Sequence, residues 1–171
     1  MTPTDLADLD RRLRRIEDRA EIQELGQRYC RYIDDSDWAR LRTLFTDDAA
    51  MAGQTGGDAV VATLRAIRGG YGRTIHTAQG LVLEQQDDGH ARGYVPSSAQ
   101  LDIGGQFVVS AIRYFDEYVK AGGAWKFARR DLRFAYALPW SQAGLALIDE
   151  LPVRWPGTEP APADDPSGGP Q

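Results

Sequence analysis

Hydrophobic residues recur with the period of an α-helix through the first third of the chain. The first stretch carries an apolar seam whose members repeat every three or four residues: Leu6, Leu9, Leu13, Ile16 and Ala20. A second helical stretch follows, with apolar residues at Ile22, Leu25, Tyr29 and Ile33. A third helix is predicted from Trp38, capped by Ser36 or Asp37. The pattern therefore predicts a helical beginning to the chain.

A fourth helix, capped by Asp58, is predicted to end at Gly69-Gly70, and the pattern then becomes that of β-strands. Long strands are predicted at 74–86, 90–103, 106–120 and 124–137, with a short one near 48–54. Pro96 lacks an N–H group, so we expect a sheet edge or a bulge there. Helices followed by a meander of long antiparallel strands predict an α+β domain in which a curved sheet wraps over helices.

Beyond the last strand the composition changes. A few apolar residues before Pro152 predict a short segment that could form a lid over the domain, and the proline- and glycine-rich sequence after it predicts a disordered tail. The expected organisation is an N-terminal helix over 1–20, available for packing or for an oligomer contact. An α+β domain over 21–140 and a C-terminal extension over 141–171 follow.

Composition limits the class of protein. The chain has 171 residues, 42% hydrophobic and 26% charged, as expected for one globular domain. A net charge of -5, with no basic stripe, argues against nucleic acid as a partner. No apolar run approaches the ~18 residues that cross a membrane and no signal peptide is recognised, so we expect a cytoplasmic protein. Cys30 and two separated histidines give no metal-ligand spacing, and we expect no metal.

One histidine is a candidate for catalysis. His76 lies in an apolar, β-prone run, whereas His90 lies in a turn-like Asp-Asp-Gly-His sequence. An imidazole can accept a proton near neutral pH, and a neighbouring carboxylate would orient it. The best candidate for that carboxylate is Asp34, at the end of the second helical stretch.

Several of these residues occur in an order that resembles the SnoaL-like proteins of the nuclear transport factor 2-like superfamily. The resemblance rests on Ile22-Gln23-Glu24-Leu25, Tyr29, Asp34, Asp37-Trp38, Leu41, Leu44-Phe45, Thr74-Ile75-His76 and Gly123-Ala124-Trp125-Lys126-Phe127-Ala128. It implies a cone-shaped α+β barrel in which N-terminal helices pack in a curved, mostly antiparallel sheet around an apolar pocket. The chain looks closest to scytalone dehydratase, bile-acid 7α-dehydratase and hexachlorocyclohexane dehydrochlorinase.

The resemblance also implies roles for individual residues. Asp34 and His76 match the Asp–His pair that these enzymes use for elimination, and Tyr29 matches a tyrosine of the bile-acid enzyme. Arg133 resembles a pocket arginine of that enzyme after a one-residue shift, and Arg129 is the alternative. Val95-Pro96-Ser97-Ser98 occupies the place of a second pocket histidine of scytalone dehydratase. Trp38 is expected in the core, with substrate binding as a further role.

The sequence thus predicts a cofactor-independent lyase that acts on a small, apolar, ring-containing molecule, most simply a dehydratase. His76 is the expected base, Asp34 orients it, and Tyr29 donates to a carbonyl or leaving oxygen. An isomerase or cyclase with the same pair, and a non-catalytic module for hydrophobic ligands, are alternatives. A water-activating Asp–Arg–Asp site is conceivable at Asp131 and Arg133, but it would leave His76 unexplained. The family and the seam also predict a homodimer or homotrimer.

Overall fold

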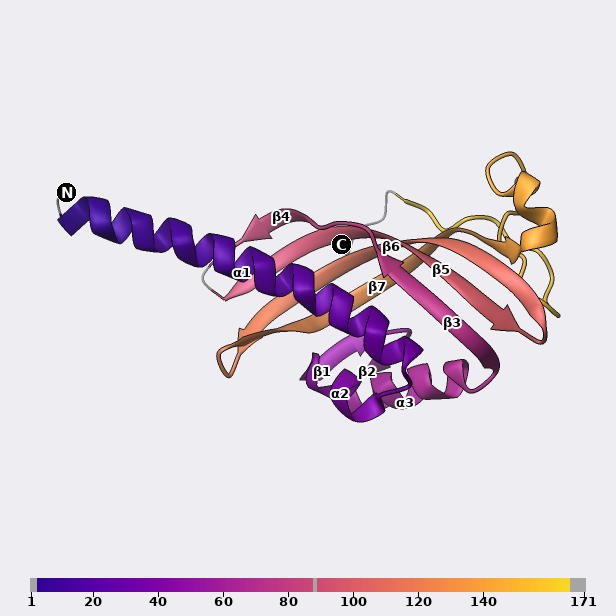
Figure 1. Cartoon of the computed structure of the whole chain (residues 1–171), viewed down its shortest axis with the longest axis horizontal. Coiled ribbons are helices and arrows are strands. Elements are labelled where there is room, and N and C mark those ends of the chain that lie inside the picture. Colours follow the sequence, from indigo (N-terminus) through magenta and orange to yellow (C-terminus); the bar gives the residue numbers. More distant parts are fainter. Residues whose placement is uncertain (1–2, 88, 167–171) are drawn as a thin grey trace.

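Helices lie across the concave face of a curved sheet in the computed structural model, which describes residues 3–87 and 89–166 (Figure 1). The helices are α1 (Pro3–Asp34), α2 (Trp38–Thr43), α3 (Gly57–Arg68) and the short 3-10 helix η1 (Trp140–Leu145). The strands are β1 (Phe45–Met51), β2 (Gln54–Thr55), β3 (Tyr71–Ala78), β4 (Val82–Gln86), β5 (His90–Ile103), β6 (Gln106–Ala121) and β7 (Ala124–Pro139). The predicted α+β architecture, with helices against a curved sheet, is confirmed.

The sheet follows the order β2-β1-β7-β6-β5-β3, and β4 pairs with β5 beside β3. All of its pairs are antiparallel except β1 with β7, which is parallel. The β6–β7 turn consists of Gly122 and Gly123, with φ angles of 62° and 84° that favour glycine in tight hairpins. β5, β6 and β7 are the long strands of the sheet, and α1 packs on the sheet mainly against β3 and β7.

The strand predicted over 74–86 is two strands, β3 and β4, which pair in succession with β5. β4 pairs with β5 as far as Tyr94, and β3 pairs with β5 from Ser97 onward. Pro96 lies between them, where β5 changes partner, so its missing N–H costs no ladder hydrogen bond. The prediction of a sheet edge or a bulge at Pro96 is wrong, because β5 is an internal strand and Pro96 lies in the gap between two partner strands on one side of it.

α1 is one continuous helix, not two, and the boundary expected at residue 20 falls inside it. Its C-terminal half packs on the sheet through the buried residues Ile22, Leu25, Tyr29 and Ile33. Its N-terminal half extends past the sheet (Figure 1). The seam residues Leu6, Leu9, Leu13 and Ile16 are all exposed, because at 100° per residue they lie about 180° away from the buried stripe.

Two local expectations have different outcomes. Asp37 is the N-cap of α2 and accepts a hydrogen bond from the backbone N–H of Arg40, as one of the two candidates predicted. Asp58 does not cap α3, whose N-cap is Gly56. It accepts instead from Arg42, whose guanidinium also binds Asp47, and this joins α2, α3 and β1.

The C-terminal segment, 152–166, is not the disordered tail that its composition predicted. Val153 bridges to Ala137 of β7 and to Ala161, so the segment folds back on itself beside β7. The Phe134 N–H donates to the Asp164 carboxylate, and Arg133 donates to the Asp165 carbonyl. β1 covers only the first half of the β7 edge, and these contacts satisfy part of the remainder. Residues 167–171 lie outside the described part of the chain.

None of the helices in the described residues is long and apolar enough to cross a membrane.

Candidate active site

α1 and β3 together place Asp34 and His76 in direct contact. The Asp34 Oδ1 atom lies 2.7 Å from the His76 Nδ1 atom, as the sequence predicted. The same carboxylate accepts from the Thr74 hydroxyl at 2.7 Å and from the His76 backbone N–H at 2.8 Å. Thr74 and His76 are two residues apart in β3, so both side chains leave the strand on the side where α1 ends.

The environment keeps Asp34 ionised. Burial raises the pKa of Asp34, but hydrogen bonds from the His76 ring, the His76 N–H and the Thr74 hydroxyl outweigh it, so its pKa lies below the usual value. An ionised carboxylate only accepts hydrogen bonds, so the neutral His76 ring must carry its proton on Nδ1. The Nε2 lone pair is then available to act as a base.

Asp34 is also the last residue of α1, at the negative end of the helix dipole. A carboxylate is disfavoured there, and its three hydrogen-bond donors compensate.

His76 lines a cavity of about 410 Å³ between α1, α3 and the concave face of the sheet. Most of the lining is apolar, from residues such as Ile33, Leu64, Leu101 and Ile112. Ser110 also lines it, and its buried hydroxyl has no hydrogen-bond partner among the described residues. His90 is an exposed residue beside Asp87 and does not line this cavity. Among the described residues, His76 is therefore the histidine of the cavity.

Tyr29 lies in the same cavity wall, and a buried arginine stands against its ring. The Arg130 guanidinium carbon is 4.3 Å from the Tyr29 ring centre, and Arg130 binds Asp116 through two hydrogen bonds of 2.9 and 3.0 Å. Burial raises the pKa of Tyr29, so its phenol stays protonated and can donate. Its hydroxyl lies 3.9 Å from the Met51 sulfur and also interacts with the Arg130 side chain.

The inward-facing arginine of β7 is Arg130, and neither Arg133 nor Arg129 lines the cavity. Arg133 binds Asp131 at 2.7 Å and lies over the Phe115 ring, on the other face of the sheet. Its geometry gives no support to the predicted substrate contact. Alternation from Phe127 alone would have turned residue 129 inward, but a shift in register between β6 and β7 after Phe127 turns Arg130 inward instead.

Trp38 packs against the hydrophobic core and is absent from the cavity lining. The lining residues that were not predicted from the sequence include Arg68, Tyr71, Tyr114 and Trp155. Alternation along β6 could have identified Tyr114, since the buried positions recur at every second residue of that strand. Trp155 lies in the segment whose composition indicated disorder, so no local signal pointed to it.

These features define a class: an α+β cone with an apolar cavity and an Asp–His pair in its wall. The SnoaL-like domain family matches residues 14–131, and the chain belongs to this family. Among solved structures, hexachlorocyclohexane dehydrochlorinase LinA-type3 from Novosphingobium barchaimii is 25% identical, with a TM-score of 0.69 over 75% of this chain and 94% of that one.

Two proteins of Novosphingobium aromaticivorans are also similar. A proposed scytalone dehydratase is 25% identical, with a TM-score of 0.64 over 82% of this chain and 92% of that one. An NTF2-like protein with a cystatin-like fold is 28% identical, with a TM-score of 0.62 over 86% and 99%. No significant match was found among curated proteins. The predicted family is therefore confirmed.

Proposed function

We propose that this protein is a lyase that eliminates water or halide from a small ring-containing molecule. The observation that carries the proposal is the 2.7 Å contact between Asp34 and His76 in the wall of an apolar cavity. Similar structures that include a dehydrochlorinase and a proposed dehydratase support the lyase class.

The reaction needs two events. The His76 Nε2 atom takes a proton from a carbon next to an electron-withdrawing group, and the C–H electron pair becomes the new C=C bond. The leaving group departs from the neighbouring carbon with its own electron pair. A hydroxyl group leaves as water after receiving from the imidazolium the proton that His76 took, while the Tyr29 hydroxyl donates a hydrogen bond to the leaving oxygen. A halide needs only a hydrogen bond. Asp34 stabilises the imidazolium throughout.

The side chains at the site can perform both proton transfers, so the proposal requires no cofactor. Positioned acid–base groups typically contribute about 10²–10⁴-fold to a rate, and orientation in a dry cavity supplies further acceleration. The Tyr29–Arg130 contact fixes one wall of the cavity, and Asp34 fixes the His76 ring.

The test is a panel of two substrate types. Hexachlorocyclohexane would be followed by chloride release, and cyclic β-hydroxy ketones by the ultraviolet absorbance of the conjugated product. The wild-type protein should convert at least one of them. His76→Gln, which keeps the size and polarity of the ring approximately, should lower kcat by about 10²–10⁴-fold on that substrate. Full activity of His76→Gln would contradict the proposal and favour a binding module, and a product that retains the leaving group would indicate an isomerase.

A further inference from the structure

One end of the cavity holds a cation that the elimination mechanism does not use. Arg68, the last residue of α3, lines the cavity together with Tyr71. Its Nη1 atom donates to the Tyr71 carbonyl at 3.0 Å, and its buried Nε has no partner among the described residues. No carboxylate of the described chain forms an ion pair with it.

The surroundings make this unpaired guanidinium unusual. The cavity lining is mostly apolar, and a charge there is costly unless an opposite charge compensates it. Among the described residues that line the cavity, only Asp131 has a carboxylate, and this carboxylate is bound to Arg133 on the other face of the sheet. A planar guanidinium favours carboxylates and other oxyanions through paired hydrogen bonds. An anionic group of a ligand would supply the missing partner.

An aromatic wall adjoins the same cavity. Trp155, carried by the C-terminal segment, lines it and meets the Phe134 ring edge-to-face, with 5.0 Å between ring centres. The backbone bridges of Val153 and the hydrogen bonds between Phe134 and Asp164 hold this segment against β7. Rings at such sites prefer to pack against the rings of a ligand.

We propose that the cavity binds a ring-containing anion, with its acidic group on Arg68 and its ring against Trp155 and Phe134. This inference rests on the proposed function and narrows its substrate class. Uncharged polychlorinated rings then lack one of the groups that the cavity recognises, whereas a hydroxylated ring acid has all of them.

Two probes with the same ring system test the anion site without any turnover. 1-Anilinonaphthalene-8-sulfonate carries a negative group, and N-phenyl-1-naphthylamine does not. Fluorescence titration should show tighter binding of the sulfonate, although the net charge of -5 opposes anions in general. Arg68→Gln should lower the affinity for the sulfonate about 10-fold or more, because hydrogen bonds to charged groups are stronger than those between neutral groups. The affinity for the amine should not change. Arg68→Lys should keep part of the preference.

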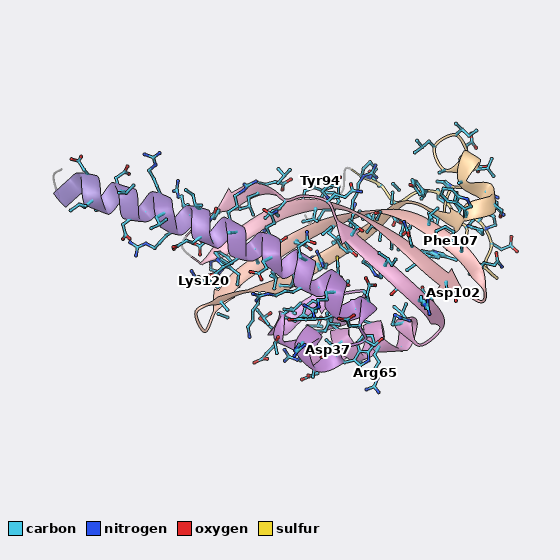
Figure 2. The ribbon with its side chains drawn as sticks, viewed as in Figure 1. Asp37, Arg65, Tyr94, Asp102, Phe107 and Lys120 are labelled. Atoms are coloured by element: carbon cyan, nitrogen blue, oxygen red, sulfur yellow. The ribbon has the colours of Figure 1, made fainter. Side chains whose placement is uncertain are left out.

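The matched control is Arg65→Gln, which removes an exposed arginine of the same helix that points away from the cavity (Figure 2). It should change neither affinity. Trp155→Ala should weaken both probes, because both contain the ring. Equal binding of the two probes by the wild type, failure to bind either, or an unchanged sulfonate affinity in Arg68→Gln would overturn the proposal. Thermal melts of each variant confirm that it is folded.

The outcome is separable from that of the elimination test. His76→Gln should keep the preference for the sulfonate over the amine, since Arg68 and not His76 provides that preference. If Arg68 selects the sulfonate but no substrate is turned over, the anion site stands and the lyase fails. If turnover depends on His76 while Arg68→Gln changes neither probe binding nor KM, the lyase stands and the anion site fails.

Discussion

At the scale of single residues, the site depends on how one carboxylate is satisfied. Asp34 lies where a helix disfavours negative charge, yet the hydrogen bonds from Thr74 and His76 lower its pKa. The consequence is functional as well as structural. In the proposed mechanism, an ionised Asp34 keeps the proton of the neutral His76 ring on Nδ1 and would stabilise the ring when it accepts a second proton, so the two residues would act as one unit.

Acting as a unit predicts strong non-additivity. Asp34→Asn and His76→Gln should each lower the elimination rate, because one change removes the group that orients the ring and the other removes the base. The double variant should be little slower than the slower single variant. Tyr29→Phe should cost less, since its hydroxyl assists the leaving group only. Steady-state kcat on a converted substrate measures all four variants, and additive losses would mean that Asp34 and His76 work independently.

The carboxylate also makes a prediction about pH. Thr74→Val removes one donor to Asp34 and should cost about 1 kcal/mol of unfolding free energy at pH 7. The pKa of Asp34 is lowered in the folded state. Its stabilisation is therefore present above the unfolded value of about 3.9 and is lost as pH falls through the folded value. Urea denaturation should therefore show a smaller effect of Thr74→Val at pH 3. Thr77→Val, at an exposed position of the same strand, should have little effect at either pH.

At the scale of elements, the connection between α1 and the sheet decides where the site residues meet. Asp18, buried in the middle of α1, accepts from Lys120 of β6 at 2.7 Å and from the Trp125 indole of β7 at 2.8 Å. Figure 2 shows Lys120 at the part of the sheet beside α1. This contact fixes the position of α1 along the sheet. It thereby also fixes the position of Asp34, which lies about four helical turns further along α1.

Loss of that contact should lower the stability of the fold. Asp18→Asn leaves the Lys120 ammonium without its ion-pair partner, and Asp18→Ala also leaves the buried Trp125 N–H unsatisfied. We expect Asp18→Ala to lower the free energy of unfolding by about 2–3 kcal/mol, measured by urea denaturation. Asp8→Ala, which removes an exposed ion pair with Arg11 in the same helix, should cost less than about 0.5 kcal/mol. Equal losses would show that Asp18 has no special role.

The sequence predicted most elements because their signals are local. The strands at 90–103, 106–120 and 124–137 were found almost to the residue, since alternation and paired glycines are properties of neighbouring positions. The Asp34–His76 contact was predicted through the family resemblance. Arg130 and Trp155 were missed because their placement depends on long-range features. A register shift turns Arg130 inward, and pairing with β7 orders the segment that carries Trp155.

At the scale of the whole molecule, the N-terminal half of α1 has an apolar seam that no other part of the described chain covers. Leu6, Leu9, Leu13 and Ile16 are about half-exposed or more, and at 100° per residue they lie on the side of the helix opposite the residues that pack on the sheet. The domain cannot cover them, because its own contact uses the opposite side. An apolar stripe with this spacing is typical of helices that pair with another helix.

We predict that the partner is a second copy of the chain, in a parallel helix pair. Flanking charges favour this choice, since Arg12 lies on one side of the seam and Glu17 on the other. Glu17 lies five positions after Arg12, so a parallel pair places Arg12 of each copy against Glu17 of the other. Neither residue forms an ion pair within the described chain. Because the seam lies about 180° from the stripe that packs on the sheet, such a pair would place the two domains on its outer sides.

Light scattering after size exclusion at micromolar concentration should therefore give about twice 18.9 kDa for the wild type. Leu9→Asp with Leu13→Asp should give a monomer, because each change would bury a carboxylate in the seam. The matched control is Leu147→Asp with Ile148→Asp, at two residues that are more exposed than the seam residues and lie at the other end of the molecule. This control should remain a dimer. Arg12→Glu should weaken the dimer, and adding Glu17→Arg should restore it. A wild-type monomer, or a dimer that survives both seam changes, would contradict the prediction, and a trimer would place the contact on another face.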